Sequence, residues 1–244
     1  MSLEFTVKGI LLDVEGTTSA VSYVYDVMFP YVRTALAGYL DAQWDADEMM
    51  PVKQQVAVDA GAESFDAWTV GDEQRSVFET EIVRLMDGDV KATGLKQLQG
   101  LIWRDGFESG ALRSHVFPDV APALEHWTTN GLDVRIYSSG SVLAQKLFFA
   151  HTEEGDLTRY LSGHYDTTTG PKREAASYTA IAADWGIDPA EILFLSDITA
   201  ELDAAREAGL ATALTVRPGN AEAESSTPPH PSCDYFSELR IGSL

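Results

Sequence analysis

Two acids, Asp13 and Glu15, stand two positions apart at the end of a short apolar run, and a glycine and two threonines follow them. In an extended chain, side chains two positions apart leave on the same side, so both carboxylates face one region. Converging carboxylates repel each other, and a divalent cation relieves that repulsion. The stretch 8–18 therefore predicts a buried strand that ends in a turn suited to a cation.

Further polar groups occupy comparable places along the chain. Ser138 and Ser139 follow one apolar run, Asp197 follows another, and Lys172 precedes a segment that favours helix. If these runs are parallel strands, their carboxyl ends gather at one edge of the sheet, where such sheets bind ligands. We therefore expect these groups to share a crevice with the two acids.

The residue types at this edge suit phosphoryl transfer. A carboxylate can attack a phosphoryl group to form an aspartyl-phosphate, and the developing charge needs a metal ion, a cation and neutral donors. We hypothesise that Asp13 is the nucleophile and that Lys172 neutralises it and the phosphoryl oxygens. Ser138 or Ser139, together with the amides after Asp13, is expected to donate hydrogen bonds to the phosphate.

The metal hypothesis assigns Mg²⁺ to Asp13, Glu15 and Asp197, because the donors are all oxygen and no Cys or His stands at ligand spacing. Taken alone, an acid after a strand is more often a helix cap or turn residue, and a single lysine is usually a solvated charge. The order of all these groups along one chain favours the joint interpretation.

The segments that position these residues alternate between strand and helix patterns. Strands are expected at 10–12, 132–137, 162–166, 192–195 and 211–216, with helices at 118–127, 142–150, 173–185 and 199–208. This alternation predicts an α/β fold with a doubly wound parallel sheet. Residues 217–235 are rich in Pro, Ser and Ala without periodicity and are expected to be mobile, whereas 236–239 are expected to dock back.

A helical insertion is expected after the first strand. Residues 21–40 repeat apolar side chains at spacings of three and four, and helical sequence continues at 52–58, 65–68, 77–86 and 95–103. No strong strand pattern interrupts this region. We therefore expect a catalytic core of residues 1–19 and 116–244 and a helical cap of residues 20–115.

The composition is ordinary for a globular protein except for its acidity. The 244 residues carry a net charge of −21, which argues against nucleic acid or an anionic membrane as a partner. The single Cys233 excludes an internal disulfide framework, and no leader or spanning apolar run is recognised. We expect a soluble, cytoplasmic protein that acts on a small phosphorylated molecule.

Four motifs resemble those of the haloacid dehalogenase-like hydrolases, which are mostly phosphatases with a Rossmann-like core. They are DVEGTT at 13–18, Ser138, Lys172 and 196–197. The resemblance is closer to one branch, the enolase-phosphatases (acireductone synthases) of methionine salvage. The glutamate in the first motif suggests that branch, as do LQGLIW at 98–103, HVFPDV at 115–120, YSSGSV at 137–142, AQKL at 144–147 and VRPGN at 216–220.

The resemblance implies a bifunctional, Mg²⁺-dependent enzyme that enolises 2,3-diketo-5-methylthiopentyl-1-phosphate and then dephosphorylates it to an acireductone. It implies a helical cap between the first two motifs, and a monomer. By position, it assigns metal contacts to Asp13, Glu15 and Asp197, and substrate contacts to Ser138, Ser139 and Lys172. We further hypothesise that Glu15, one methylene longer than the usual acid, moves protons in phosphoryl transfer and in enolisation.

Three alternative functions use the same fold. The main rival is another phosphatase of the same superfamily that acts on a different small phosphate ester. The cap, not the core, would choose between these substrates. A haloalkanoate dehalogenase would not need the Mg²⁺ ligands, so Glu15 and Asp197 argue against it. A catalytically silent binding module on the same fold is a third reading. One departure from the superfamily pattern is that Ile198 follows Asp197; the next acid, Glu201, is expected to be structural rather than a direct ligand.

Overall fold

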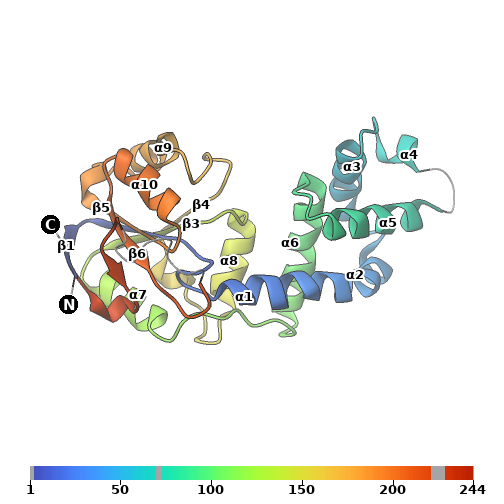
Figure 1. Cartoon of the computed structure of the whole chain (residues 1–244). Coiled ribbons are helices and arrows are strands. Elements are labelled where there is room, and N and C mark those ends of the chain that lie inside the picture. Colours follow the sequence, from blue (N-terminus) through green and yellow to red (C-terminus); the bar gives the residue numbers. More distant parts are fainter. Residues whose placement is uncertain (1–2, 70–72, 221–228, 244) are drawn as a thin grey trace. The chain divides into compact units, whose positions relative to one another are not determined.

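The computed structural model describes residues 3–69, 73–220 and 229–243 and divides the chain into two compact units (Figure 1). Unit 1 comprises Met1–Tyr25 and Arg113–Leu244, and unit 2 comprises Asp26–Leu112. The sequence predicts these junctions after residues 19 and 115. The first junction falls later because Tyr23 is buried in unit 1, where its hydroxyl donates to the carbonyl of Arg113 at 2.7 Å.

Unit 1 is built on a six-stranded parallel sheet of order β4-β3-β2-β5-β6-β7. This confirms the α/β class. The strands are β2 (Gly9–Leu12), β3 (Asp133–Tyr137), β4 (Gly163–Tyr165), β5 (Ile192–Ser196), β6 (Ala211–Thr215) and β7 (Ser232–Cys233). Every residue of β2 and β5 is buried, as expected for central parallel strands that are covered on both faces.

Helices cover both faces of this sheet, with α9 and α10 on one face and α7 on the other (Figure 1). They are α7 (Val120–Thr129), α8 (Val142–Ala150), α9 (Ala175–Trp185) and α10 (Thr199–Glu207), with short turns η3 (Thr158–Tyr160), η4 (Pro189–Glu191) and η5 (Phe236–Glu238). Leu11 of β2 shares a core cluster with Tyr178 of α9 and Leu202 of α10. Helix α9 begins later than predicted because the amide of Glu174 donates back to Pro171 in a turn.

A second, two-stranded parallel sheet pairs β1 (Leu3–Val7) with β8 (Leu239–Ser243), and neither strand was predicted. The expectation that 217–235 is mobile is wrong for its described ends. Arg217 and Cys233 are buried, and Cys233 lies in β7, which pairs with β6; residues 221–228 lie outside the described residues. The docking of 236–239 is confirmed, since Phe236 is buried and its ring lies 5.2 Å from that of Trp127.

In its described residues, 26–69 and 73–112, unit 2 contains helices and turns but no strand. The chain enters it through α1 (Val21–Tyr23) and the π-helical turn η1 (Val24–Met28). Its helices are α2 (Phe29–Gln43), α3 (Met49–Asp59), α4 (Phe65–Trp68), α5 (Gln74–Asp87) and α6 (Thr93–Glu108). They enclose their own apolar core, in which Phe78 and Ile102 are buried. The helical insertion predicted from periodicity is therefore present.

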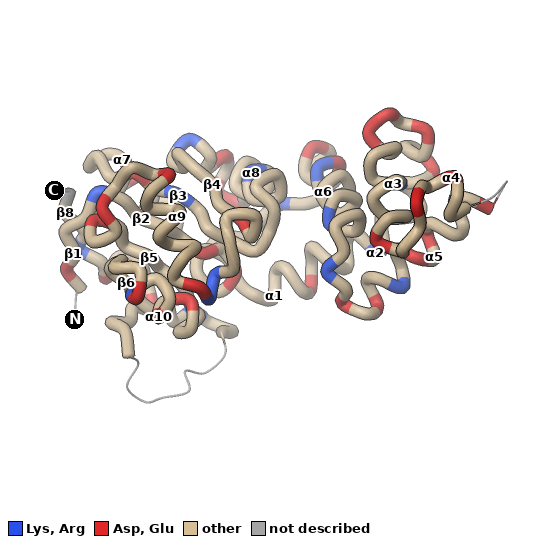
Figure 2. The backbone as a smooth tube through the Cα atoms, turned by 90° about the horizontal axis from the view of Figure 1, so that it is seen from above, with Lys and Arg blue, Asp and Glu red and all other residues tan. Residues whose placement is uncertain are grey.

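Acidic residues are spread along the elements of both units rather than gathered on one element (Figure 2). The sequence has 38 Asp and Glu against 17 Lys and Arg, so acidity is a general property of this chain. Among the described residues, none of the helices is both long and apolar enough to cross a membrane.

Candidate active site

The carboxyl ends of β2, β3 and β5 bring the predicted residues to one edge of the sheet. In the parallel register, Leu12 lies beside Ile136 on one neighbour and Leu195 on the other. The chain after Leu12 enters the turn of residues 13–19, hereafter the Asp13 turn. Ser138 and Asp197 leave the adjacent strands at the same edge, as the strand order predicted.

The Asp13 carboxylate is buried and held at both oxygens. Lys172 Nζ lies 2.5 Å from Asp13 Oδ1, and Ser196 Oγ lies 3.4 Å from Oδ2. The Asp13 amide donates to the carbonyl of Leu195 at 3.0 Å, which fixes the start of the turn on β5. A carboxylate fixed in this way has few rotamers to lose when it attacks a substrate.

Glu201 belongs to this group through its contact with Lys172, in agreement with the structural role expected for it. Lys172 Nζ lies 2.6 Å from Glu201 Oε2, and Ser196 donates to the same oxygen at 2.9 Å. Glu201 lies in the first turn of α10, one helical turn after Asp197, and that spacing was the available clue. Lys172 thus bridges two buried carboxylates.

Glu15 and Ser138 meet across the turn. The Ser138 hydroxyl donates to Glu15 Oε2 at 3.3 Å and accepts from the Gly140 amide at 3.1 Å. Ser138 is buried, whereas Ser139 at the next position is exposed. The structure therefore brings Ser138 to the acids through a direct contact and leaves the Ser139 side chain open to solvent.

The amides of the Asp13 turn are largely used within the turn itself. The amides of Thr17, Thr18 and Ser19 all donate to the carbonyl of Val14, and the Gly16 amide donates to Ser19. The predicted phosphate donors were the amides after Asp13; because the closed turn satisfies those of Gly16, Thr17 and Thr18, that prediction now concerns the amides of Val14 and Glu15. The part of residues 16–18 is to shape the turn.

Asp197 packs directly against the Asp13 turn. Gly16 has φ +77°, and a Cβ there would lie 2.5 Å from Asp197 Cγ, so only glycine permits this approach. Asp197 Oδ1 is buried without a hydrogen-bond partner in the described part of the chain. Burial, followed by the charges of Asp13 and Glu201, raises the pKa of Asp197 to about 7. This carboxylate is short of a positive partner.

We predict that Gly16→Ala displaces Asp197 and weakens the response to Mg²⁺. The new methyl group would overlap the carboxylate in addition to the strain of a positive φ, which costs about 1 kcal/mol. The phosphoryl-transfer activity that the sequence predicts, titrated with the predicted Mg²⁺, should show at least a tenfold higher half-saturating concentration, of the order seen when the surroundings of metal ligands are altered.

The matched control is Gly186→Ala. Gly186 has φ +72° at the end of α9, and a Cβ there meets no atom within 4 Å, so it tests backbone strain alone. An equal rise in the Mg²⁺ requirement of both variants would contradict the steric explanation.

The charges at this edge are unbalanced. Asp13, Glu15, Asp197 and Glu201 contribute four carboxylates, and Lys172 is the cation that contacts two of them. Burial would lower the pKa of Lys172, but the carboxylates of Asp13 and Glu201 outweigh burial and raise it above its ordinary value. Burial and the charge of Asp13 raise the pKa of Glu15, and burial, then Asp13, raises that of Glu201 to about 7. The site attracts a further cation.

The predicted metal ligands are only partly arranged for an ion. Within residues 3–69, 73–220 and 229–243, no group of three or more His, Cys, Asp or Glu side chains is placed to hold a metal. The Glu15 carboxylate instead accepts a hydrogen bond from Ser138. The orphaned oxygen of Asp197 beside the Asp13 turn does fit a hard divalent cation, because the donors there are all oxygen.

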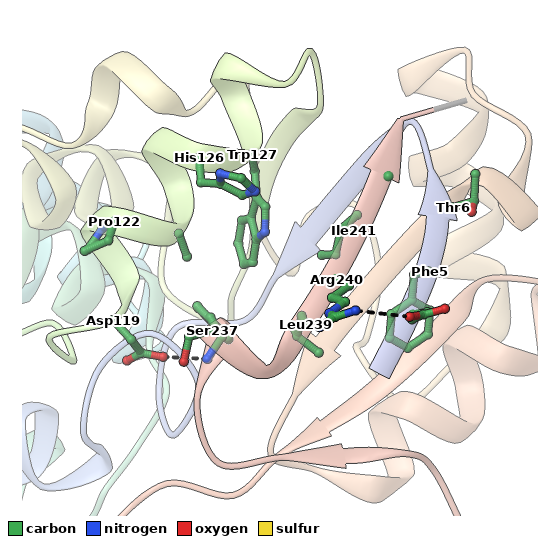
Figure 3. A pocket seen from close by; sticks show the side chains of 14 residues that line it. Phe5, Thr6, Asp119, Pro122, His126, Trp127, Ser237, Leu239, Arg240 and Ile241 are labelled. Carbon is green, nitrogen blue, oxygen red and sulfur yellow. Dashed lines mark hydrogen bonds and ion pairs between the residues drawn. The ribbon is translucent and has the colours of Figure 1, made fainter. Parts of the chain in front are cut away.

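A cavity of about 830 Å³ lies elsewhere in unit 1, between α7 and the strands β1 and β8 (Figure 3). It is lined by Trp127, Phe236, Leu239 and Ile241, with Asp119 and Arg240 among its polar residues. None of the predicted site residues lines it. This cavity therefore does not coincide with the predicted chemistry, and the charged edge of the sheet remains the candidate site.

Comparison with known families gives one extensive match. A family profile described as haloacid dehalogenase-like hydrolase matches residues 7–209, which span β2 to the end of α10. All the predicted site residues fall inside that match.

Individual relatives agree with this. "Enolase-phosphatase E1" of Synechococcus elongatus is 48% identical over 228 residues, covering 92% of this chain and 94% of the relative. The protein of the same name from Drosophila willistoni is 46% identical, covering 88% and 89%. Among solved structures, the UTR4 protein of Saccharomyces cerevisiae is 33% identical with a TM-score of 0.79, covering 95% of this chain and 99% of its own.

Proposed function

This chain belongs to the haloacid dehalogenase-like hydrolases and, among them, to the enolase-phosphatases, and from that premise we propose the reaction that its site performs. The proposed substrate is 2,3-diketo-5-methylthiopentyl-1-phosphate, which the enzyme enolises and then dephosphorylates to an acireductone in methionine salvage. The observation that carries the proposal is the buried contact between Asp13 and Lys172 at the carboxyl end of the central strand. An aspartate held there by a lysine is suited to attack phosphorus.

The phosphatase step divides into two displacements. A carboxylate oxygen of Asp13 attacks phosphorus, so that an O–P bond forms while the bond from phosphorus to the substrate's C1 oxygen breaks. The departing oxygen takes a proton, and water then cleaves the aspartyl-phosphate, releasing inorganic phosphate and restoring Asp13. Lys172 offsets the charge on the phosphoryl oxygens, and its contact with Glu201 keeps it in place.

Neutral donors complete the proposed phosphate site. Ser138 already lies within hydrogen-bond distance of Glu15 and can turn its hydroxyl to a phosphoryl oxygen. Since the amides of residues 16–19 are used within the turn, the amides of Val14 and Glu15 are the proposed backbone donors. Ser139, being exposed, is proposed to contact the substrate beyond the phosphate.

Mg²⁺ is the proposed cofactor, and it would supply charge neutralisation for the carboxylates and the phosphoryl oxygens when bound. Asp13 and Asp197 are the side chains best suited to hold it, because both border the same turn and Asp197 has a buried oxygen without a partner. Glu15 as a third ligand stays a prediction, since its carboxylate faces Ser138.

Glu15 is the proposed proton carrier for both steps. It stands two residues after Asp13, close enough to protonate the departing oxygen and to take a proton from the attacking water. We predict that Glu15→Gln, which keeps the shape and removes the proton transfer, lowers phosphate release about 10²-fold or more. The enolisation rate, followed by ultraviolet absorbance, should fall with it.

The control for Glu15→Gln is Ser138→Ala, which removes the contact partner and leaves the acid. Ser138→Ala should reduce phosphate release less than Glu15→Gln does. If Glu15→Gln kept both rates close to those of the wild type, the proposed role would be lost.

One experiment tests the function as a whole. The purified protein is given the diketone phosphate with and without Mg²⁺, and the ultraviolet-absorbing enol and free phosphate are measured together. We expect both products, and both to depend on Mg²⁺. Phosphate without an enol would favour a phosphatase of another ester, and neither product, with a generic ester also left intact, would favour a silent binding module.

We also propose that the protein acts in the cytoplasm as a monomer. The net charge of −21 supports the monomeric state, because like charges oppose self-association. Light scattering on the eluting protein should then give the 26.6 kDa mass of a single chain.

A further inference from the structure

Two sequence motifs with no assigned role meet at the Asp13 turn: HVFPDV at 115–120 and VRPGN at 216–220. Three consecutive carbonyls of the turn each accept a hydrogen bond from one of these motifs. The bonds run from Asn220 Nδ2 to Gly16 at 2.9 Å, from Arg217 Nε to Thr17 at 3.0 Å, and from the Phe117 amide to Thr18 at 3.0 Å. The turn is thus anchored by two segments on the side of its carbonyls.

Arg217 is the centre of this anchoring. Its Nη1 contacts both oxygens of Asp119, at 3.0 and 2.9 Å, and donates to the carbonyl of Asp234 at 2.8 Å. The guanidinium lies between two aromatic rings, 4.8 Å from the centre of Phe117 and 4.4 Å from that of Phe236. Such a planar group, fixed by a carboxylate and by stacking, holds its remaining donor in one direction.

The burial of Arg217 is not explained by a contribution to the free energy of unfolding. The Arg217 side chain is 1% exposed, and its Nη2 is buried without a hydrogen-bond partner within the described residues. Burying a charged group with an unused donor costs free energy, and apolar side chains often replace buried ion pairs without loss of stability. The geometry is better explained by what Nε does, which is to bind the carbonyl of Thr17.

We propose that Arg217, held by Asp119, is a positioning residue for phosphoryl transfer: it fixes the Asp13 turn so that Asp13 and Glu15 keep their places relative to Lys172 and Ser138. The inference rests on the proposed function. Asp13 begins the turn and contacts Lys172, and Glu15 lies in the turn, one residue before Gly16. A displacement of about 1 Å in a reacting group costs on the order of a hundredfold in rate.

The test is Arg217→Lys, measured as kcat and KM for the diketone phosphate with saturating Mg²⁺. Lysine keeps the charge beside Asp119. It has no group equivalent to Nε, so it loses the hydrogen bond to the Thr17 carbonyl. We expect kcat per folded enzyme to fall about tenfold to a hundredfold while KM changes less than about threefold. Asp119→Asn, which weakens the contact that holds the guanidinium, should likewise lower kcat while leaving KM nearly unchanged.

Trp185→Phe is the matched control. Trp185 donates from Nε1 to Asp133 at 2.6 Å, and its ring lies 4.6 Å from the guanidinium of Arg135, so the variant loses a comparable hydrogen bond while an aromatic ring remains beside the arginine. Its ring lies beside Gly9, at the opposite end of β2 from Asp13. We expect its kcat per folded enzyme to stay within twofold of the wild type.

Two further variants, Asn220→Ala and Arg217→Ala, test the same proposal. If Arg217→Lys does not fold, Asn220→Ala, which removes the bond to Gly16 alone, should show a smaller loss of kcat with KM unchanged. Added guanidinium ion should partly restore kcat to Arg217→Ala. If wild type and Arg217→Lys are equally active per folded enzyme, or if Trp185→Phe loses as much, the positioning role is overturned. An inactive wild type would instead overturn the proposed function.

Discussion

Asp13→Asn is expected to lower phosphate release by about 10⁴-fold or more, because it replaces the nucleophile with an amide of the same shape. The amide still fills the space beside Lys172 and Ser196, so the turn should keep its structure. Enolisation does not need an aspartyl-phosphate, and the variant should still form the ultraviolet-absorbing enol. Single-turnover reactions with separate enol and phosphate detection measure both steps.

The control for this prediction is Asp203→Asn, which removes an exposed carboxylate of α10 that pairs with Arg206. It should retain both rates. Equal loss of enol and phosphate in Asp13→Asn would point to a failed metal site or a failed fold, and thermal unfolding would separate these two causes.

Lys172→Met is expected to be damaging in two ways. It removes the cation that offsets the phosphoryl oxygens, which costs about 10²–10³-fold in kcat. It also leaves the carboxylates of Asp13 and Glu201 buried without their partner, and breaking a buried ion pair costs about 3–5 kcal/mol of unfolding free energy. Urea unfolding and steady-state kinetics on the same preparation measure the two effects.

The double variant Lys172→Met with Glu201→Gln separates the two effects. Removing the charge of Glu201 relieves the repulsion left behind, so part of the lost unfolding free energy should return. Activity should not return, since the cation remains absent. Recovery of both would mean that Lys172 acts only as a structural residue.

The central sheet and the main site contacts were predictable from the sequence for a physical reason. Strands such as β2 and β5 are covered on both faces and therefore read as continuous apolar runs, and polar groups follow each of them directly. Parallel strands end at one edge, so Asp13, Ser138 and Asp197 had to approach each other once the sheet was recognised. Lys172 follows from the same order of elements.

The parts that escaped prediction depend on contacts between distant segments. β1 alternates exposed and less exposed residues from Leu3 to Val7, a strand pattern that is easily overlooked because its partner β8 is at the other end of the sequence. The contact between Glu201 and Lys172 forms only because the first turn of α10 lies beside Lys172 in the fold. The hydrogen bonds within the Asp13 turn could likewise not be predicted, because the residue types at 16–19 do not determine which carbonyls their amides bind.

The pairing of β1 with β8 has a consequence for how the protein is made. β1 is synthesised before unit 2 and before the six-stranded sheet, and its partner β8 is synthesised after all of them. Unit 2 is one continuous segment of the chain, Asp26–Leu112, so it can fold while translation continues. Unit 1, by contrast, cannot complete its β1–β8 sheet until β8 has been synthesised, so this pairing forms after unit 2 has already been made.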